Sequence, residues 1–251
     1  MARIKIYIQY LADITWNNAA TCGFSINNGV DVWRIGINSS LSQLNNFLAV
    51  MPPDEIARAN RYFYTKDKHR FIISRGAVRN ILGKYLGLPA ASIEFETGGN
   101  KKPHIKNTNN INVHYNISHS GDWILLAISN SPIGADTEQV IQGYSYKDVL
   151  PGNFSEAETE YINQTSPVER FFTLWTRKEA LTKATGKGLD DDLKLIPALD
   201  GTHFVESKTI SSDDDWLIST FQLAENYSAS VACSSKVDVI SFRDVDFTNI
   251  I

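Results

Sequence analysis

The hydrophobic pattern of this 251-residue chain changes period several times along its length. Alternating apolar and polar residues, as at residues 4–8, are typical of a strand with one buried face. Longer stretches repeat apolar residues at helical spacing, as Val78, Leu82 and Tyr85 do. We expect strands near residues 4–8, 30–33, 93–95, 123–129, 203–205, 216–223, 227–233 and 237–242.

Two long helices are predicted, and each is closed by a glycine. The first covers residues 66–86 and stops at Gly87, and the second covers residues 167–185 and stops at Gly186. The sequence Ser-Pro-Val-Glu at residues 166–169 fits a capping box with proline at the first helical position. We therefore expect the second helix to begin there.

The order of these elements suggests two halves of similar make-up. A turn at residues 131–134 breaks the chain after a mostly apolar stretch, and we place a subdomain boundary there. Residues 1–131 and 132–251 would then form an N-terminal and a C-terminal subdomain, each with one long helix and several strands. The predicted fold class is α+β.

Composition narrows the choice of function classes. A hydrophobic content of 43% and a charged content of 21% are those of a soluble globular protein. The net charge of −4 argues against a protein that coats nucleic acid or an anionic membrane. Cys22 and Cys233 are too far apart to suggest a zinc knuckle, and no signal peptide or membrane span is visible. We expect a cytoplasmic protein with reduced thiols.

The first segment with candidate chemistry is the acidic pair Asp136 and Glu138. Two residues two apart on a strand point to the same face, so both carboxylates would lie side by side. They would repel each other unless a cation lay between them, and Mg²⁺ prefers such oxygen ligands. Taken alone, such a pair is more often a solvated strand end.

The second segment is a stripe on the predicted second helix. Helical spacing places Phe172, Trp175, Glu179 and Lys183 on one face. Glu179 and Lys183 by themselves would make an ordinary surface pair at i and i+4. Together with the pair at residues 136 and 138, however, Glu179 can be a third metal ligand. Lys183 would then be free to neutralise a phosphate.

The third segment, residues 116–121, lies between a polar loop and an apolar strand. Ser118 and His119 offer hydrogen-bond donors suited to phosphate oxygens. A nucleophilic Ser–His pair is the alternative, but adjacent residues on an extended chain point to opposite faces, which disfavours proton transfer between them. Both residues could also serve only to end the strand.

The fourth segment is strongly basic. Residues 58–84 contain eight lysines and arginines against a single acidic residue, Asp67. Such a stretch is most often a solvated helix face, but here it is also the place to anchor a polyanionic ligand. Lys101 and Lys102 add two cations in a later loop. The remaining histidines lack metal-ligand spacing and are interpreted as structural.

Taken in order, these segments resemble the surfactin-synthetase-activating (Sfp) type of 4′-phosphopantetheinyl transferase. The resemblance extends from about Asp54 to Cys233. Its motifs are Lys102-Pro103, residues 116–120, Gly134-x-Asp136-x-Glu138, Trp175-x-x-Lys178-Glu179-Ala180 with Lys183, and Gly186-Lys187-Gly188-Leu189. It implies two similar α+β subdomains related by a pseudo-twofold axis, with coenzyme A in the cleft between them.

The resemblance also implies the residues of the site. Asp136, Glu138 and Glu179 match the carboxylates that hold Mg²⁺, and Glu179 and Lys183 would act in catalysis. The residues that match contacts of coenzyme A are Arg58, Arg70, Lys102, Pro103, Ser118, His119 and Lys183.

Within that set, His119, Arg58 and Arg70 would lie near the 3′-phosphate, and Lys102 beside the adenine nucleotide. Glu55 and Phe71 depart from the family pattern, because they stand where a lysine and a small polar residue are expected.

The implied reaction transfers phosphopantetheine from coenzyme A to a serine of an apo carrier protein and releases 3′,5′-ADP. The carriers would belong to fatty acid, polyketide or nonribosomal peptide synthases, and the enzyme is expected to act as a monomer, without nucleic acid or membrane. The base could be Glu179, Glu158 or a metal-bound water. Alternatives are a Mg²⁺-dependent nuclease using the same carboxylates and a non-catalytic protein that binds coenzyme A or docks a carrier.

Overall fold

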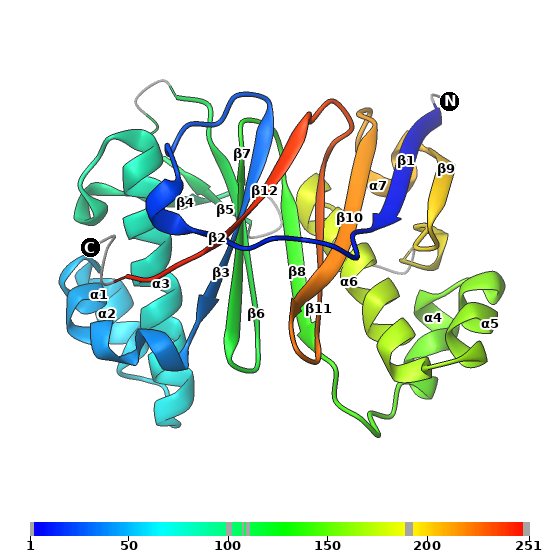
Figure 1. Ribbon diagram of the computed structural model, residues 1–251, viewed down its shortest axis with the longest axis horizontal. Helices are drawn as coiled ribbons and strands as arrows, with labels where there is room; N and C mark the ends of the chain where they lie inside the picture. Colours follow the sequence, from blue (N-terminus) through cyan, green and yellow to red (C-terminus); the bar gives the residue numbers. More distant parts are fainter. Residues whose placement is uncertain (1–2, 99–101, 107, 109–110, 189–192, 248–251) are drawn as a thin grey trace.

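The computed structural model describes residues 3–98, 102–106, 108, 111–188 and 193–247. The chain forms two five-stranded sheets and one small hairpin (Figure 1). The first sheet has the strand order β2-β12-β3-β7-β6, and the second has the order β8-β11-β10-β1-β9. The hairpin pairs β4 with β5. The fold class is α+β, as predicted.

The predicted strands are present with shifts at some ends, but residues 17–18, 103–105 and 114–120 form strands that the hydrophobic pattern did not predict. The strands are β1 (Arg3–Tyr10), β2 (Asn17–Asn18), β3 (Gly29–Gly36), β4 (Phe95–Thr97), β5 (Pro103–Ile105), β6 (His114–Ser120), β7 (Trp123–Ser129), β8 (Gly134–Gln139), β9 (Gly201–Glu206), β10 (Trp216–Ala224), β11 (Tyr227–Ser234) and β12 (Val239–Asp244). The helices are α1 (Leu44–Ala49), α2 (Pro53–Ala59), α3 (Thr65–Leu86), α4 (Leu150–Asn153), α5 (Glu156–Gln164), α6 (Pro167–Thr185) and α7 (Ser207–Ile210).

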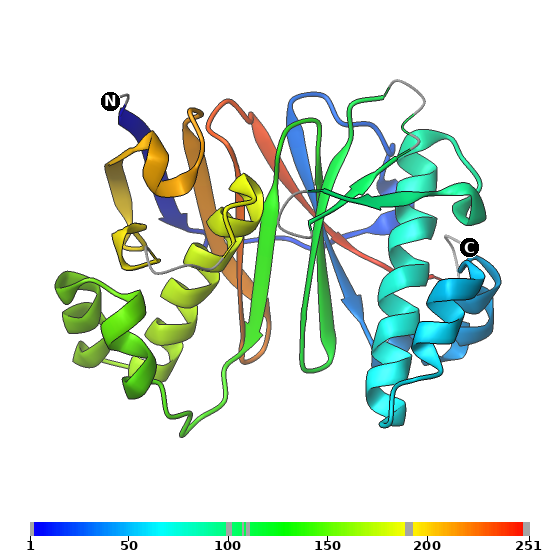
Figure 2. The ribbon, with the colours of Figure 1, turned by 180° about the vertical axis from the view of Figure 1, so that it is seen from behind.

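The two sheets pack against each other between the two long helices. Val32 and Leu125 of the first sheet share a buried cluster with Phe221 and Val231 of the second. The opposite face of each sheet is covered by a long helix, α3 on the first sheet and α6 on the second (Figures 1 and 2). The helices therefore lie outside and the sheets inside. This arrangement buries both faces of the central strands, which suits near-continuous apolar strands such as β7.

The terminal strands pair with the sheet that the other half of the chain builds. β1 runs parallel to β10, with Ile6 opposite Trp216. β12 runs parallel to β3, with Phe242 opposite Val32. The subdomain boundary at residues 131 and 132 remains a prediction. Each terminal strand, however, belongs to one side of that boundary in sequence and pairs with a strand from the other side.

Both long helices end as predicted, at Gly87 and Gly186, which adopt left-handed conformations with φ of 63° and 74°. The capping box predicted at Ser166 is wrong. Ser166 has φ of 45° and makes no capping hydrogen bond with its side chain. The capping box of the structure begins helix α5 instead, where Ser155 and Glu158 cap each other's backbone N–H groups.

The strand expected at residues 93–95 begins at its last residue, Phe95, because a 3₁₀ turn over Ala90–Ser92 precedes it. Lys101, named above as a cation of the later loop, and Leu189, the last residue of a sequence motif, lie outside the described residues. A search of the described helices finds none that is long and apolar enough to cross a membrane.

Candidate active site

The candidate site lies where an edge strand of one sheet meets an edge strand of the other. β6 and β8 run side by side (Figure 2), and side chains of β6 bond to the backbone of β8. Asn116 accepts a hydrogen bond from the amide of Ala135 at 2.8 Å, and Ser120 accepts one from the amide of Gln139 at 3.0 Å. Residues two apart on β6 therefore face β8, as strand geometry requires.

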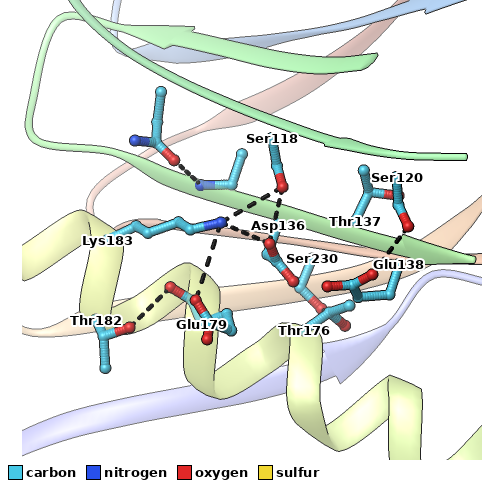
Figure 3. Close-up of polar contacts among 12 residues, drawn as sticks. Ser118, Ser120, Asp136, Thr137, Glu138, Thr176, Glu179, Thr182, Lys183 and Ser230 are labelled. Carbon is cyan, nitrogen blue, oxygen red and sulfur yellow. Dashed lines mark hydrogen bonds and ion pairs between the residues drawn. The ribbon is translucent and has the colours of Figure 1, made fainter. Parts of the chain in front are cut away.

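β8 contributes the two carboxylates that the sequence places on one face. Ser118 Oγ donates to Asp136 Oδ1 at 2.8 Å, and Ser120 Oγ donates to Glu138 Oε2 at 2.9 Å (Figure 3). Asp136 is almost fully buried, with 3% of its surface exposed. The two acids are thus held by two serines from the opposite strand.

Helix α6 approaches β8 closely because residue 134 has no side chain. A Cβ atom added at Gly134 would lie 2.0 Å from the carbonyl oxygen of Ala180 and 2.3 Å from the amide nitrogen of Ala184. Any larger residue would push the helix away from the strand. This glycine therefore sets the distance between the carboxylates of β8 and the side chains of α6.

From that helix, Glu179 and Lys183 reach the carboxylates of β8 (Figure 3). Lys183 Nζ lies 2.6 Å from Asp136 Oδ1 and 3.9 Å from Glu179 Oε2. The same ammonium is 3.4 Å from Ser118 Oγ. The predicted helical stripe and the predicted strand face thus meet at one place.

The pKa values of all three carboxylates are raised. Burial is the largest cause for each, and it raises the pKa of Asp136, of Glu138 and of Glu179. For Glu138 and Glu179 the negative charge of Asp136 is the second cause, and the pKa of Glu179 reaches about 7. Lys183 opposes the shift at all three groups. The site has more negative charge than one lysine balances.

The donor atoms suit a hard cation, although the described side chains do not form a closed metal site. In the part of the chain that the structure describes, no three His, Cys, Asp or Glu side chains are already arranged around one metal position. Lys183 instead bridges two of the acids. Asp136 Oδ2 is buried and finds no hydrogen-bond partner among the described residues. A buried, unbonded carboxylate oxygen in an acidic cluster fits an oxygen-ligated cation such as Mg²⁺.

Comparisons with known proteins agree with this geometry. The family described as "4′-phosphopantetheinyl transferase, N-terminal" matches residues 37–131, and the "4′-phosphopantetheinyl transferase superfamily" matches residues 132–232. The 4′-phosphopantetheinyl transferase HetI of a Nostoc species is 33% identical over 165 residues, which are 64% of this chain and 70% of that protein.

The 4′-phosphopantetheinyl transferase Sfp of Bacillus subtilis is 27% identical over 223 residues, covering 82% of this chain and 93% of that protein. The chain belongs to the 4′-phosphopantetheinyl transferase superfamily. The resemblance to its Sfp type, inferred from the motifs, is confirmed.

The basic residues assigned to the 3′-phosphate lie partly together. Arg70 is close enough to His119 for its charge to lower the pKa of the imidazole, after desolvation by surrounding protein atoms as the larger cause. His119 is nevertheless exposed at the surface. Arg70 also forms an ion pair with Asp67 at 2.7 Å, and the Arg58 guanidinium stacks on Phe71 at 5.1 Å.

Lys102 bonds to the backbone of the C-terminal half of the chain. Its ammonium donates to the carbonyl oxygens of Ile133, Lys183 and Ala184, at 3.0, 2.6 and 3.2 Å. Burial lowers its pKa to about 8. Lys102 thus ties the loop before Pro103 to the C-terminal end of α6, where it also lines a cavity between the two halves.

Two acids named in the sequence analysis, Glu55 and Glu158, form buried ion pairs in this fold. Glu55 is buried and forms ion pairs with Arg75 and Arg79, so its carboxylate is neutralised within the N-terminal half. Glu158 is buried against Lys178 at 3.0 Å.

Conversely, the sequence did not predict that Asn116 and Ser120 bond to the backbone of β8. The signal was present, because both lie two residues from Ser118 on the same strand.

Proposed function

We propose that this protein transfers the 4′-phosphopantetheine group of coenzyme A to a serine hydroxyl of an apo carrier protein, with Mg²⁺ as its metal ion. The observation that carries the proposal is the meeting of Asp136, Glu138 and Glu179 with Lys183 between the two sheets. The superfamily match and the names of the relatives support the same reaction. The carriers would be those of fatty acid, polyketide or nonribosomal peptide synthases.

Asp136, Glu138 and Glu179 would hold the metal ion. Their raised pKa values mean that the site stabilises added positive charge. When bound there, Mg²⁺ supplies charge that neutralises the diphosphate of coenzyme A. Lys183 provides a second cation, and its bond to Asp136 would be exchanged for one to a phosphate oxygen.

The chain itself supplies the base and no nucleophile. The carrier serine oxygen forms a bond to the β-phosphorus while the bond from that phosphorus to 3′,5′-ADP breaks, and the leaving oxygen keeps the electron pair. Glu179 takes the serine proton as the general base of the reaction. The rate enhancement comes from positioning and charge stabilisation.

The nucleotide would bind on the side of the first sheet. Arg58, Arg70 and His119 would contact the 3′-phosphate, with Ser118 on a phosphate oxygen. Lys102 and Pro103 would border the adenine nucleotide. We further propose that the two halves are related by a pseudo-twofold axis with the cofactor between them, and that the protein acts as a cytoplasmic monomer.

The test is an assay of intact carrier mass. The purified protein, coenzyme A and Mg²⁺ are incubated with a panel of apo carriers, and each carrier is expected to gain one phosphopantetheine unless the divalent cations are chelated. Asp136→Ala and Glu179→Gln should each lower the rate by at least about a hundredfold, since each removes a proposed ligand of the Mg²⁺ that neutralises the phosphates. Asp213→Ala, which removes an exposed aspartate, should keep the native rate.

Three results would contradict the proposal. One is a folded protein that modifies no carrier in the panel. Another is cleavage of DNA or RNA without coenzyme A, which would indicate a nuclease. A third is a near-native rate in Asp136→Ala, which would remove the carboxylates from the reaction.

A further inference from the structure

Ser120 differs from its neighbour Ser118 in what it bonds. Ser118 donates to Asp136, and Lys183 Nζ lies 3.4 Å from its hydroxyl. Ser120 instead joins the side chain of Glu138 to the backbone of Gln139. Ser120 thus contacts one carboxylate of the site and the strand that carries it.

The two hydrogen bonds fix the direction of the Ser120 hydroxyl proton. The amide of Gln139 donates into a lone pair of Ser120 Oγ at 3.0 Å. Since a hydroxyl has one proton, that proton points to Glu138 Oε2, at 2.9 Å. The carboxylate is therefore held by a directed, charge-assisted hydrogen bond, which limits its rotation and sets where its second oxygen points.

The hairpin that carries Ser120 is itself held against β11. Tyr227 Oη accepts a hydrogen bond from the amide of Asp122 at 3.1 Å. Gly121 has φ of 51°, and a Cβ atom at that position would lie 2.1 Å from Tyr227 Oη. The turn between β6 and β7 thus packs tightly on the second sheet, and Ser120 is held in register with β8.

We infer that Ser120 is a positioning residue that orients Glu138 for the metal ion, an inference that rests on the proposed function. Ser120 need not touch substrate, coenzyme A or the metal. It acts through Glu138, in the way that outer hydrogen-bond partners orient metal ligands in other proteins. The hydroxyl links the first sheet to a ligand that the second sheet supplies.

The experiment compares Ser120→Ala, Ser120→Thr and Ser129→Ala in the full chain. Threonine keeps the hydroxyl and suits a strand. Ser129 is the matched control, because its hydroxyl also bonds at the far end of the same hairpin, but to the carbonyl oxygen of Gly29. Mg²⁺ is titrated into each protein with coenzyme A and without a carrier, so that no turnover occurs, and hydrogen exchange of the Gln139 amide is measured without metal.

Ser120→Ala should bind Mg²⁺ about tenfold more weakly, at the lower end of the 10–100-fold loss typical of outer-shell substitutions. Its Gln139 amide should exchange faster, because that amide loses its acceptor. The carrier reaction of Ser120→Ala should need more Mg²⁺ but approach the native rate at saturation. Ser120→Thr should restore most of the affinity, and Ser129→Ala should match the native protein.

Two results for folded Ser120→Ala would overturn the inference: unchanged Mg²⁺ affinity, or unchanged exchange of the Gln139 amide. A native protein that binds no Mg²⁺ beside coenzyme A would instead overturn the proposed function, and the metal role of Ser120 with it. Failure of the inference alone and failure of the function are therefore distinguishable.

Discussion

Helix α6 carries two adjacent charged residues, Lys178 and Glu179, whose surroundings differ in one decisive respect. Lys178 is fully buried, and its ammonium lies 3.0 Å from Glu158 Oε2. The ammonium also donates to the carbonyl oxygens of Leu193 and Ile196. Glu158 in turn accepts from the amides of Ser155 and Ala198, at 2.9 and 2.8 Å. Charge and hydrogen bonds are balanced around this pair.

Around Glu179, in contrast, neither the charges nor the hydrogen bonds are balanced. Asp136, Glu138 and Glu179 face a single described lysine, Lys183, whose ammonium is 3.9 Å from Glu179. Asp136 keeps a buried carboxylate oxygen that makes no hydrogen bond within the described part of the chain. Each cluster joins charged residues of α6 to acids of another element, but only this second one has room for further positive charge.

The comparison separates a structural ion pair from a binding site. A buried pair whose every polar atom is satisfied holds elements together and has nothing left to offer a ligand. A cluster of carboxylates with raised pKa values and oxygens that accept no hydrogen bond destabilises the folded protein unless a cation binds there. Substitutions should therefore change stability in the first cluster, and ligand binding and pH dependence in the second.

The largest effect on stability is expected from Glu158→Gln. It leaves the buried ammonium of Lys178 without its counter-charge, and breaking a buried pair in this way costs about 3–5 kcal/mol. Urea unfolding of the variant, beside native protein and the exposed control Glu156→Gln, measures the loss. The folded fraction should keep its transfer rate.

An opposite outcome would revise the comparison. If Glu158→Gln were as stable as the native protein but inactive, Glu158 would belong to the reaction as its base. Glu179 would then act as a metal ligand alone.

A smaller effect is expected from Glu179→Gln in the metal-free protein, and its sign is reversed. Burial and the charge of Asp136 raise the pKa of Glu179 from 4.5 to about 7, so the folded state binds the proton more tightly than the unfolded state. Its contribution to stability is full below pH 4.5 and is lost as pH rises toward 7. Above pH 7 the variant should be more stable than the native protein, by roughly 3 kcal/mol at most.

Denaturation at pH 5 and pH 8 in the presence of a chelator measures this difference for both proteins. The native protein should lose more stability between the two pH values than Glu179→Gln does. Added Mg²⁺ should reduce the gap, because the cation compensates the carboxylates. Parallel pH curves for the two proteins would mean that Glu179 is not held in an acidic, buried setting.

Local periodicity was enough to predict the reactive part of the site. Residues two apart on a strand and four apart on a helix share a face, and this places Asp136 with Glu138 and Glu179 with Lys183. The meeting of the two faces was inferred from the chemistry of three carboxylates and a lysine, and the family resemblance implied the same set. The meeting depends on Gly134, whose packing against α6 is a tertiary contact that neither local pattern contains.

Other features depend on partners far apart in the sequence. The pairing of β1 with β10 joins residues about two hundred positions apart, and no local pattern identifies such a partner. Ser155 and Ser166 both begin a Ser-x-x-Glu sequence, but only Ser155 has the extended backbone of a capping residue, with φ of −68° and ψ of 167°. Ser166 is left-handed, with φ of 45° and ψ of 58°, so its side chain does not cap the helix.

The smallest effect, and the last, concerns selectivity for the 3′-phosphate of coenzyme A. His119, Arg58 and Arg70 are the groups proposed to contact it, and each charge-assisted hydrogen bond contributes about 1.5–3 kcal/mol. Dephospho-coenzyme A should therefore bind at least about tenfold more weakly, since 1.4 kcal/mol is a factor of ten. Glu55 does not oppose this, because Arg75 and Arg79 neutralise its carboxylate.

His119→Ala should remove part of that preference and leave Mg²⁺ binding unchanged. The control is His203→Ala. His203 lies in the other sheet, where its ring bonds to the carbonyl oxygen of Leu199. Because the pKa of His119 is lowered, its ring is mostly neutral at pH 7, and the preference should grow as pH falls and the imidazole becomes charged. Calorimetry with both ligands at two pH values measures this. Equal affinities of the native protein for the two ligands would place the 3′-phosphate away from His119 and its neighbours.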